Sequence, residues 1–348
     1  MRLPSARGTL TTTLFPALHG VGPFPVDELV SLVCDADSGG ATLDDDDVHT
    51  ALWAAYQLHY TGFDDVDDRW EWDPDLLRLR RALEDRFLAE LRFRTADIVQ
   101  QALEAKGSVA DRLFAMTENV EGPALAAYLR RDATHEEMLE LLVQRSIHNL
   151  QESDPQAFVL PRVGGRPKVA LAELLYDEFG AGRPERLHSA LFARGLAECG
   201  LDDEPGAYVS VVPGVTLAFM NAMNLLALHR GHAAAALGHF GAYEATSSVP
   251  SRLVAAAVDR LGFPASVRAY FDEHVEADAV HEQLALREIC GGVAEADPSV
   301  VPDLFFGAAV CLLTDAAVSQ HLLSSWSDGR SSLCSPVEHR ELPEKVAS

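Results

Sequence analysis

The chain has 348 residues, of which 48% are hydrophobic, so it is long enough to bury a substantial core in one large domain or two modest ones. It carries 53 acidic against 28 basic residues and a formal net charge of −25, which argues against nucleic acid and anionic membranes as partners, because both attract Lys and Arg. The first twenty residues contain no continuous apolar segment, so we expect no cleaved secretory signal and a cytoplasmic location.

Helical patterning dominates the first part of the chain, and no run of alternating polar and apolar residues indicates a strand. We predict a small helical N-terminal region over residues 1–122, with helices at 25–34, 46–60 and 74–93. A second, all-helical domain is predicted over residues 123–330 and a loose tail over 331–348.

Turn and cap residues divide this second domain into helices. Thr134 and Glu137 form a capping-box pattern at the start of one helix, and a second is predicted from Val169 to Glu178. Gly180 to Pro184 breaks that helix, and Pro184 at a first helical position restarts the chain through His188 to Cys199. Further helices are predicted at 215–246, 251–261, 266–290 and 303–325. The only long apolar stretch noted, 211–243, contains an arginine and three histidines, which is wrong for a membrane span.

The most informative residues are His274, Asp278 and His281, which recur at i, i+4 and i+7 and therefore share one helix face. That face is otherwise apolar. Buried imidazole and carboxylate groups are costly unless they are paired, hydrogen-bonded or bound to a metal, and two imidazoles with a carboxylate suit iron, manganese or zinc. A buried hydrogen-bonded trio or an exposed polar stripe would give the same spacing.

Other candidate ligands lie on neighbouring helices. Glu244 ends an apolar stripe, although a carboxylate near a helix end can also reach solvent. Glu185 and His188 are spaced i, i+3, as in carboxylate-bridged iron sites of helical bundles, and Glu185 could equally serve the helix dipole. Glu178 stands before the glycine-rich break and could be a surface carboxylate. Glu152 shares a face with Arg145 and His148 and is a weaker candidate.

Four motifs of this chain, taken together, resemble the haem-oxygenase-like di-iron oxidases and oxygenases over residues 123 to 330. The motifs are Gln144-Arg-Ser146, Asp177-Glu-Phe-Gly180-Ala-Gly182 leading to His188, Tyr243-Glu244 followed by Thr-Ser-Ser, and the HxxxDxxH segment from His274 to His281. The last is the most specific. The ligand spacing is most similar to the N-oxygenating branch of that family.

The resemblance implies a haem-oxygenase-like helical bundle that holds two ferrous irons and reacts with dioxygen. It implies His188 and a nearby glutamate as ligands from the first core helix and Glu244, as a bridging ligand, from the second. His274, Asp278 and His281 come from the third. Glu178 and Glu185 both fit the position of the first-helix glutamate, which leaves open which one binds.

The expected activity is oxidation of a small organic substrate, with N-oxygenation of an amine or amino-acid derivative as the leading reaction. Oxidative C–C cleavage or desaturation of an amino or fatty acid is the alternative. We also expect an external electron donor and a homodimer formed through the N-terminal region. The rival interpretations are a haem-binding protein and a non-catalytic helical protein.

Overall fold

A computed structural model describes residues 1–35, 42–118 and 124–337, without the side chains of residues 35 and 276–279. Every regular element in the described residues is a helix, which confirms the predicted all-α class. The α-helices are α1 (Thr9–Leu18), α2 (Val26–Asp35), α3 (Asp46–Gln57), α4 (Pro74–Glu104), α5 (Val109–Glu118), α6 (Leu125–Arg131), α7 (His135–Asn149), α8 (Asp154–Ala157), α9 (Gly165–Glu178), α10 (His188–Glu198), α11 (Gly214–Leu228), α12 (Ala233–Leu261), α13 (Ala265–Gln283), α14 (Gly292–Ala296) and α15 (Val301–Ser327).

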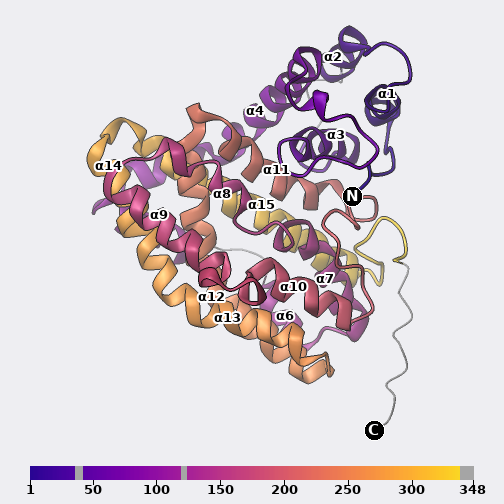
Figure 1. Ribbon diagram of the computed structural model, residues 1–348. Helices are drawn as coiled ribbons and strands as arrows, with labels where there is room; N and C mark the ends of the chain where they lie inside the picture. Colours follow the sequence, from indigo (N-terminus) through magenta and orange to yellow (C-terminus); the bar gives the residue numbers. More distant parts are fainter. Residues whose placement is uncertain (36–41, 119–123, 338–348) are drawn as a thin grey trace.

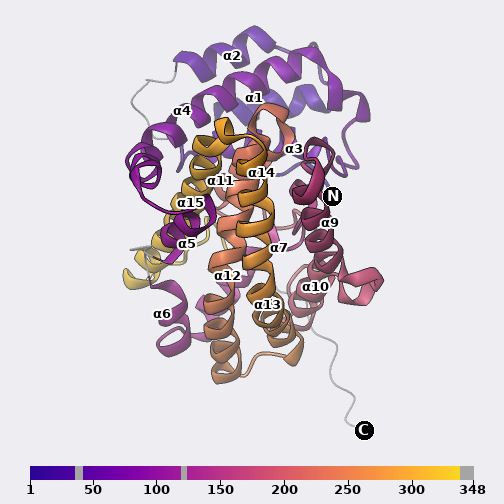
Figure 2. The same cartoon turned by 90° about the vertical axis from the view of Figure 1, so that its left-hand side faces the viewer.

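The long helices α11, α12, α13 and α15 form a bundle, and α1 to α4 lie across one end of it (Figures 1 and 2). Helix α3 packs on α11 and α4 packs on α15, so the N-terminal helices contribute to the same hydrophobic core as the bundle. The boundary near residue 122 and the dimerising role of the N-terminal region stay predictions.

Helices α12 and α15 cross at close range, and two glycines allow it. A Cβ added at Gly238 would overlap the carbonyl oxygen of Leu304, and a Cβ at Gly307 would overlap that of Ala235. Without side chains at these positions the two backbones can touch. Glu244 lies six residues after Gly238 on α12, so this crossing fixes the height at which its carboxylate enters the core.

The helix boundaries differ from the prediction at two places in this region. The apolar stretch expected as one helix over 215–246 breaks at residues 229–232, between α11 and α12. Helix α12 then continues through Pro250, where a helix end was predicted. The hydroxyl of Thr246 donates to the carbonyl of Ala242 one turn before the proline, and side-chain hydrogen bonds of this kind often bend a helix.

The last helix, α15, lies in a second long apolar segment, in addition to residues 211–243. The segment Pro298–Ser327 is long and apolar enough to cross a membrane by length and composition, and its most apolar 18-residue window has a mean hydropathy of 1.6. Half of that segment's most apolar window is buried inside the protein, against α12, α11 and α4. A helix in the core of a bundle has apolar neighbours on most sides, as a membrane-spanning helix does. Both kinds of helix are therefore apolar around most of their circumference.

The predicted loose tail is wrong for its first residues. Ser332 is buried, its backbone N–H donates to Glu140 at 2.8 Å, and its carbonyl accepts from Gln144 at 3.0 Å. These bonds fasten the chain after α15 to α7. Residues 338–348 lie outside the described part of the chain.

Candidate metal centre

Six buried side chains meet in the middle of the bundle and form two groups of three potential metal ligands. The cavity-side triad consists of Glu152, His188 and His274, and the inner triad consists of Glu178, Glu244 and His281. Within each triad, one ligand atom from every member lies within 4.8 Å of the others. Three carboxylates and three imidazoles in a water-poor core are a donor set typical of iron, manganese or zinc.

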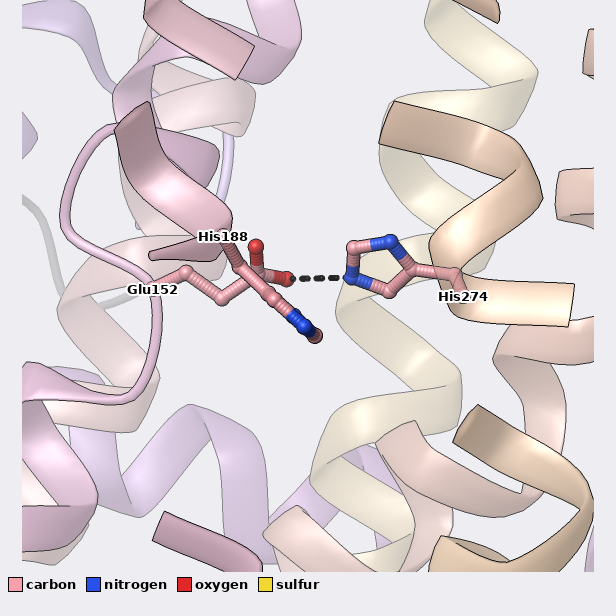
Figure 3. Close-up of side chains that lie close together, drawn as sticks. All are labelled: Glu152, His188 and His274. Atoms are coloured by element: carbon pink, nitrogen blue, oxygen red, sulfur yellow. Dashed lines mark hydrogen bonds and ion pairs between the residues drawn. The ribbon is translucent and has the colours of Figure 1, made fainter. Parts of the chain in front are cut away.

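Local backbone structure brings the cavity-side triad together. Glu152 lies in the turn after α7, next to Ser153, whose φ of 67° is left-handed and turns the chain toward α8. His188 is the first residue of α10, and His274 lies midway along α13. Figure 3 shows the Glu152 carboxylate facing the His274 ring across the space between their helices, with the His188 ring pointing into the same space.

Glu178 is the carboxylate that links the two triads. Its Oε2 lies 3.1 Å from Nδ1 of His188, and its Oε1 lies 3.4 Å from Nδ1 of His281. Glu244 Oε2 also lies 3.4 Å from His281 Nδ1. Among the described residues, Glu178 therefore contacts a histidine of each triad, whereas Glu244 contacts His281 within the inner triad. The bridging role expected for Glu244 stays a prediction.

Two ring nitrogens in the cluster have the environment of metal ligands. Nδ1 of His188 and Nδ1 of His281 are buried and make no hydrogen bond to any described residue, although carboxylate oxygens lie 3.1–3.4 Å away. A buried polar atom without a hydrogen bond is rare, because its desolvation costs about 1–3 kcal/mol. Nitrogens and oxygens that face a common point without bonding each other fit a cation at that point.

The electrostatics of the cluster also call for positive charge. Burial opposes ionisation of Glu178, but the imidazoles of His188 and His281 outweigh it and hold the pKa of Glu178 below its usual range. Burial likewise disfavours a charged His281, yet Glu178 and Glu244 raise its pKa to about 11. For Glu244, burial dominates and raises its pKa. Three acidic groups this close together require protons or metal cations, and a bound metal would displace protons from these ligands.

Hydrogen bonds from outside the triads hold several ligands in place. The Tyr270 hydroxyl donates to Glu152 Oε2 at 2.9 Å, and the Tyr270 carbonyl lies 2.8 Å from Nδ1 of His274. Asp177 lies 3.4 Å from Nε2 of His281. Metal-bound histidines commonly use their second nitrogen in this way, which fixes the ring and its tautomer. His274 and His281 are therefore already oriented with their other nitrogens toward the cluster.

The structure does not bring Glu185 into the cluster, for a reason that lies in the glycine-rich break. Pro184–Arg186 forms a separate 3-10 turn, Leu187 is extended, and α10 begins only at His188. Glu185 and His188 therefore do not share a helix face, and Glu185 is exposed. The predicted helix start at Pro184 is wrong by four residues, and Glu178, not Glu185, occupies the buried position. Asp278 lies on α13, but its side chain is outside the described residues.

Glu152 belongs to the cluster, although its sequence pattern made it the weakest of the candidate ligands. Its spacing from Arg145 and His148 was visible, but the residue follows the end of α7, so helical periodicity could not show that it turns into the core. The relevant signal is the Asp154-Pro155 pair that follows Glu152, because such a pair is typical of a helix end and places Glu152 close to a chain reversal.

A cavity of about 980 Å³ reaches the cluster from one side and is lined by residues of α5, α6, α7, α12, α13 and α15. His274 is the one member of the two triads among its described lining residues. Tyr243, Tyr270 and Phe271 give it aromatic walls, and Arg145 and Asp315 add charge. Polar and charged side chains make up about half of the lining, so the cavity suits a small molecule that has polar as well as apolar groups.

The chain is similar to a known protein family and to proteins of known structure. A profile of the family described as iron-containing redox enzymes matches residues 139–316, just over half of the chain and a span that contains all six cluster residues. No curated protein matches the sequence. Two crystal structures of a CADD-like protein of unknown function from Nostoc punctiforme are similar to this chain. One is 18% identical, with a TM-score of 0.49 over 62% of this chain and 96% of that one. The other is 16% identical, with a TM-score of 0.45 over 73% and 99%. The extent of the profile match shows that the chain belongs to the family of iron-containing redox enzymes with a haem-oxygenase-like fold.

Proposed function

We propose that this chain is a non-haem di-iron oxygenase that uses dioxygen to oxidise a small organic substrate. The observation that carries the proposal is the pair of buried triads linked by Glu178, beside a cavity of about 980 Å³. The cavity-side triad would hold one iron and the inner triad the other. Iron pairs of this kind supply the electrons with which dioxygen is reduced.

The protein's own contribution is to hold the ligands and keep the site dry. Tyr270 and Asp177 fix the orientation of Glu152, His274 and His281 before any metal binds. All six ligand residues are at most 6% exposed, so bulk water is excluded from the cluster. A prearranged, water-poor site strengthens electrostatic interactions with charge that develops during a reaction. The substrate would approach through the cavity, on the side of His274.

N-oxygenation of an amine or amino-acid derivative is the reaction we propose, with an external donor returning electrons to the site. The support is the similarity of the ligand spacing to the N-oxygenating branch, together with a cavity that contains both aromatic and charged groups. Oxidative C–C cleavage or desaturation would use the same ligands, because the fold and metal site are shared across chemistries and the substrate pocket decides between them.

The test begins with metal-free protein that is titrated anaerobically with ferrous iron. We expect two irons per chain, and about one in His281→Ala, because this change removes an inner-triad ligand. Iron-loaded protein is then mixed with ¹⁸O₂ and a panel of amines and amino acids. A product that carries ¹⁸O on nitrogen supports the proposal. Desaturated or cleaved products would replace N-oxygenation by the alternative reaction. An unchanged iron content in His281→Ala, or no iron uptake by the wild type, would reject the metal centre itself.

A further inference from the structure

The cavity beside the cluster contains a charged pair at the α7–α15 side. NH2 of Arg145 on α7 lies 3.5 Å from Oδ1 of Asp315 on α15, and their side chains are 29% and 46% exposed. Both residues line the cavity. The contact joins one nitrogen to one oxygen at the limit of hydrogen-bond distance, whereas a guanidinium can present five N–H donors in a planar fork. Arg145 and Asp315 therefore both retain bonding capacity toward the cavity.

The position of this pair relates it to the metal centre. Arg145 and Asn149 are four residues apart on α7, so they lie on the same face of the helix, and both line the cavity. Glu152 of the cavity-side triad follows in the next turn of the chain. Arg145, Tyr270 and His274 line the same cavity. A small molecule attached at Arg145 could therefore extend toward His274.

The chemistry of the pair selects one kind of substrate head group. Arginine binds carboxylates through two parallel hydrogen bonds, and aspartate accepts hydrogen bonds from ammonium groups. Because the pair as a whole is neutral, a lone anion is repelled by Asp315 and a lone cation is repelled by Arg145. A molecule that carries both charges on neighbouring atoms satisfies both residues, so the pair discriminates by repulsion as well as attraction.

A second arginine that lines the same cavity, Arg287, already interacts with neighbouring side chains. NH1 of Arg287 lies 3.3 Å from Asp111, its Nε donates to Gln283 at 2.9 Å, and its guanidinium lies 5.1 Å from the centre of the Phe114 ring. Its side chain is 50% exposed. Arg287 therefore makes more contacts and lies nearer to solvent than Arg145. It is a suitable control, since it has the same charge and lines the same cavity.

We infer that the cavity holds its substrate by a zwitterionic head, with the carboxylate of an α-amino acid on Arg145 and its ammonium group on Asp315. The rest of the molecule extends toward His274. This inference rests on the proposed function in one respect, namely that the bound amino acid is the substrate. The binding of an amino acid to this pair does not depend on iron chemistry. It makes Arg145 and Asp315 the residues that determine specificity.

The experiment screens the proteinogenic L-amino acids by thermal shift against anaerobic, iron-loaded protein, and measures the affinity of each hit by calorimetry. The amine and the carboxylic acid that match each hit serve as probes with one charge missing. We expect each to bind at least about tenfold more weakly than the amino acid. Arg145→Gln and Asp315→Asn should weaken amino-acid binding by about tenfold or more, because each removes a charged hydrogen-bond partner. Arg287→Gln should change it by less than about twofold.

Three results would overturn the inference: no amino acid binds, the matched amine or acid binds as tightly as the amino acid, or Arg287→Gln weakens binding more than Arg145→Gln does. Should Arg145→Gln fail to fold, Arg145→Lys keeps the charge without the planar fork and should give an intermediate affinity. Iron content is measured on every sample. Amino-acid binding by a protein that takes up no iron would reject the proposed function and support this inference, whereas iron uptake without amino-acid binding would do the reverse.

Discussion

The two triads are built from the same residue types in opposite proportions. The cavity-side triad has one carboxylate and two imidazoles, and the inner triad has two carboxylates and one imidazole. His274 of the first lines the cavity, whereas no member of the second is among the cavity's described lining residues. The imidazole-rich half thus faces the cavity, and the half with more carboxylates lies away from it.

Glu178 connects the two unlike triads, because its carboxylate contacts a histidine of each. The two halves are therefore neither independent sites nor a single symmetric one. A substitution confined to one triad should lower the metal occupancy of that triad first. A substitution of Glu178 should lower the metal occupancy of both triads. The predictions below use this asymmetry, from the largest expected effect to the smallest.

Removing the carboxylate that belongs to one triad should remove one iron. We expect Glu152→Gln to lose the iron of the cavity-side triad and Glu244→Gln to lose that of the inner triad, since an amide is a poor replacement for an anionic ligand. Anaerobic ferrous titration should give about one iron per chain in each variant. Mössbauer spectra of the two variants should differ, because the remaining sites have different ligands. Identical spectra would contradict the division into two unlike halves.

The α12–α15 crossing should matter for stability and for the inner triad. Gly238→Ala would force a methyl group against the Leu304 carbonyl and should lower the free energy of unfolding by about 1–3 kcal/mol. Because Glu244 follows on the same helix, iron binding in the inner triad should weaken more than in the cavity-side triad. Gly231→Ala, where nothing lies within 4 Å of the added methyl group, is the control. Equal denaturation midpoints for the two variants would show that the crossing is not tight.

Loss of the Tyr270 hydroxyl should have a smaller effect that is confined to the other half. Tyr270→Phe removes the donor that holds Glu152, and we expect ferrous affinity at the cavity-side triad to fall by roughly tenfold. The inner triad should be unchanged, because none of its members bonds to Tyr270 among the described contacts. Competition titration with a ferrous chelator separates the two affinities. A loss at both halves would indicate a general structural effect of the substitution.

The sequence predicts the helices well where caps and apolar periodicity agree. The capping box of Thr134 and Glu137 forms as expected and starts α7. Periodicity fails where tertiary packing decides. Pro250 would end an isolated helix, yet α12 continues past it while packed against α13 and α15. The break between α11 and α12 contains no proline and had no local signal strong enough to predict it.

The residues of the candidate site also fall into those that the sequence predicts and those that depend on the folded backbone. His188, Glu244, His274 and His281 were predicted from the motifs, and the structure places all four in the cluster. The choice between Glu178 and Glu185 could not be made from spacing, because it depends on the backbone between them. Gly180 and Gly182 have positive φ, as does Ala181, and this path turns Glu185 outward while leaving Glu178 in the core. Glu152 needed the same kind of information about a chain reversal.

The most direct test of the account compares iron content in Glu178→Gln and Glu185→Gln. Both changes remove one negative charge from the same short segment. If Glu178 links the triads, its variant should bind less than one ferrous ion per chain, and Glu185→Gln should bind two, like the wild type. Two irons in Glu178→Gln, or a loss of iron in Glu185→Gln, would contradict the site described here.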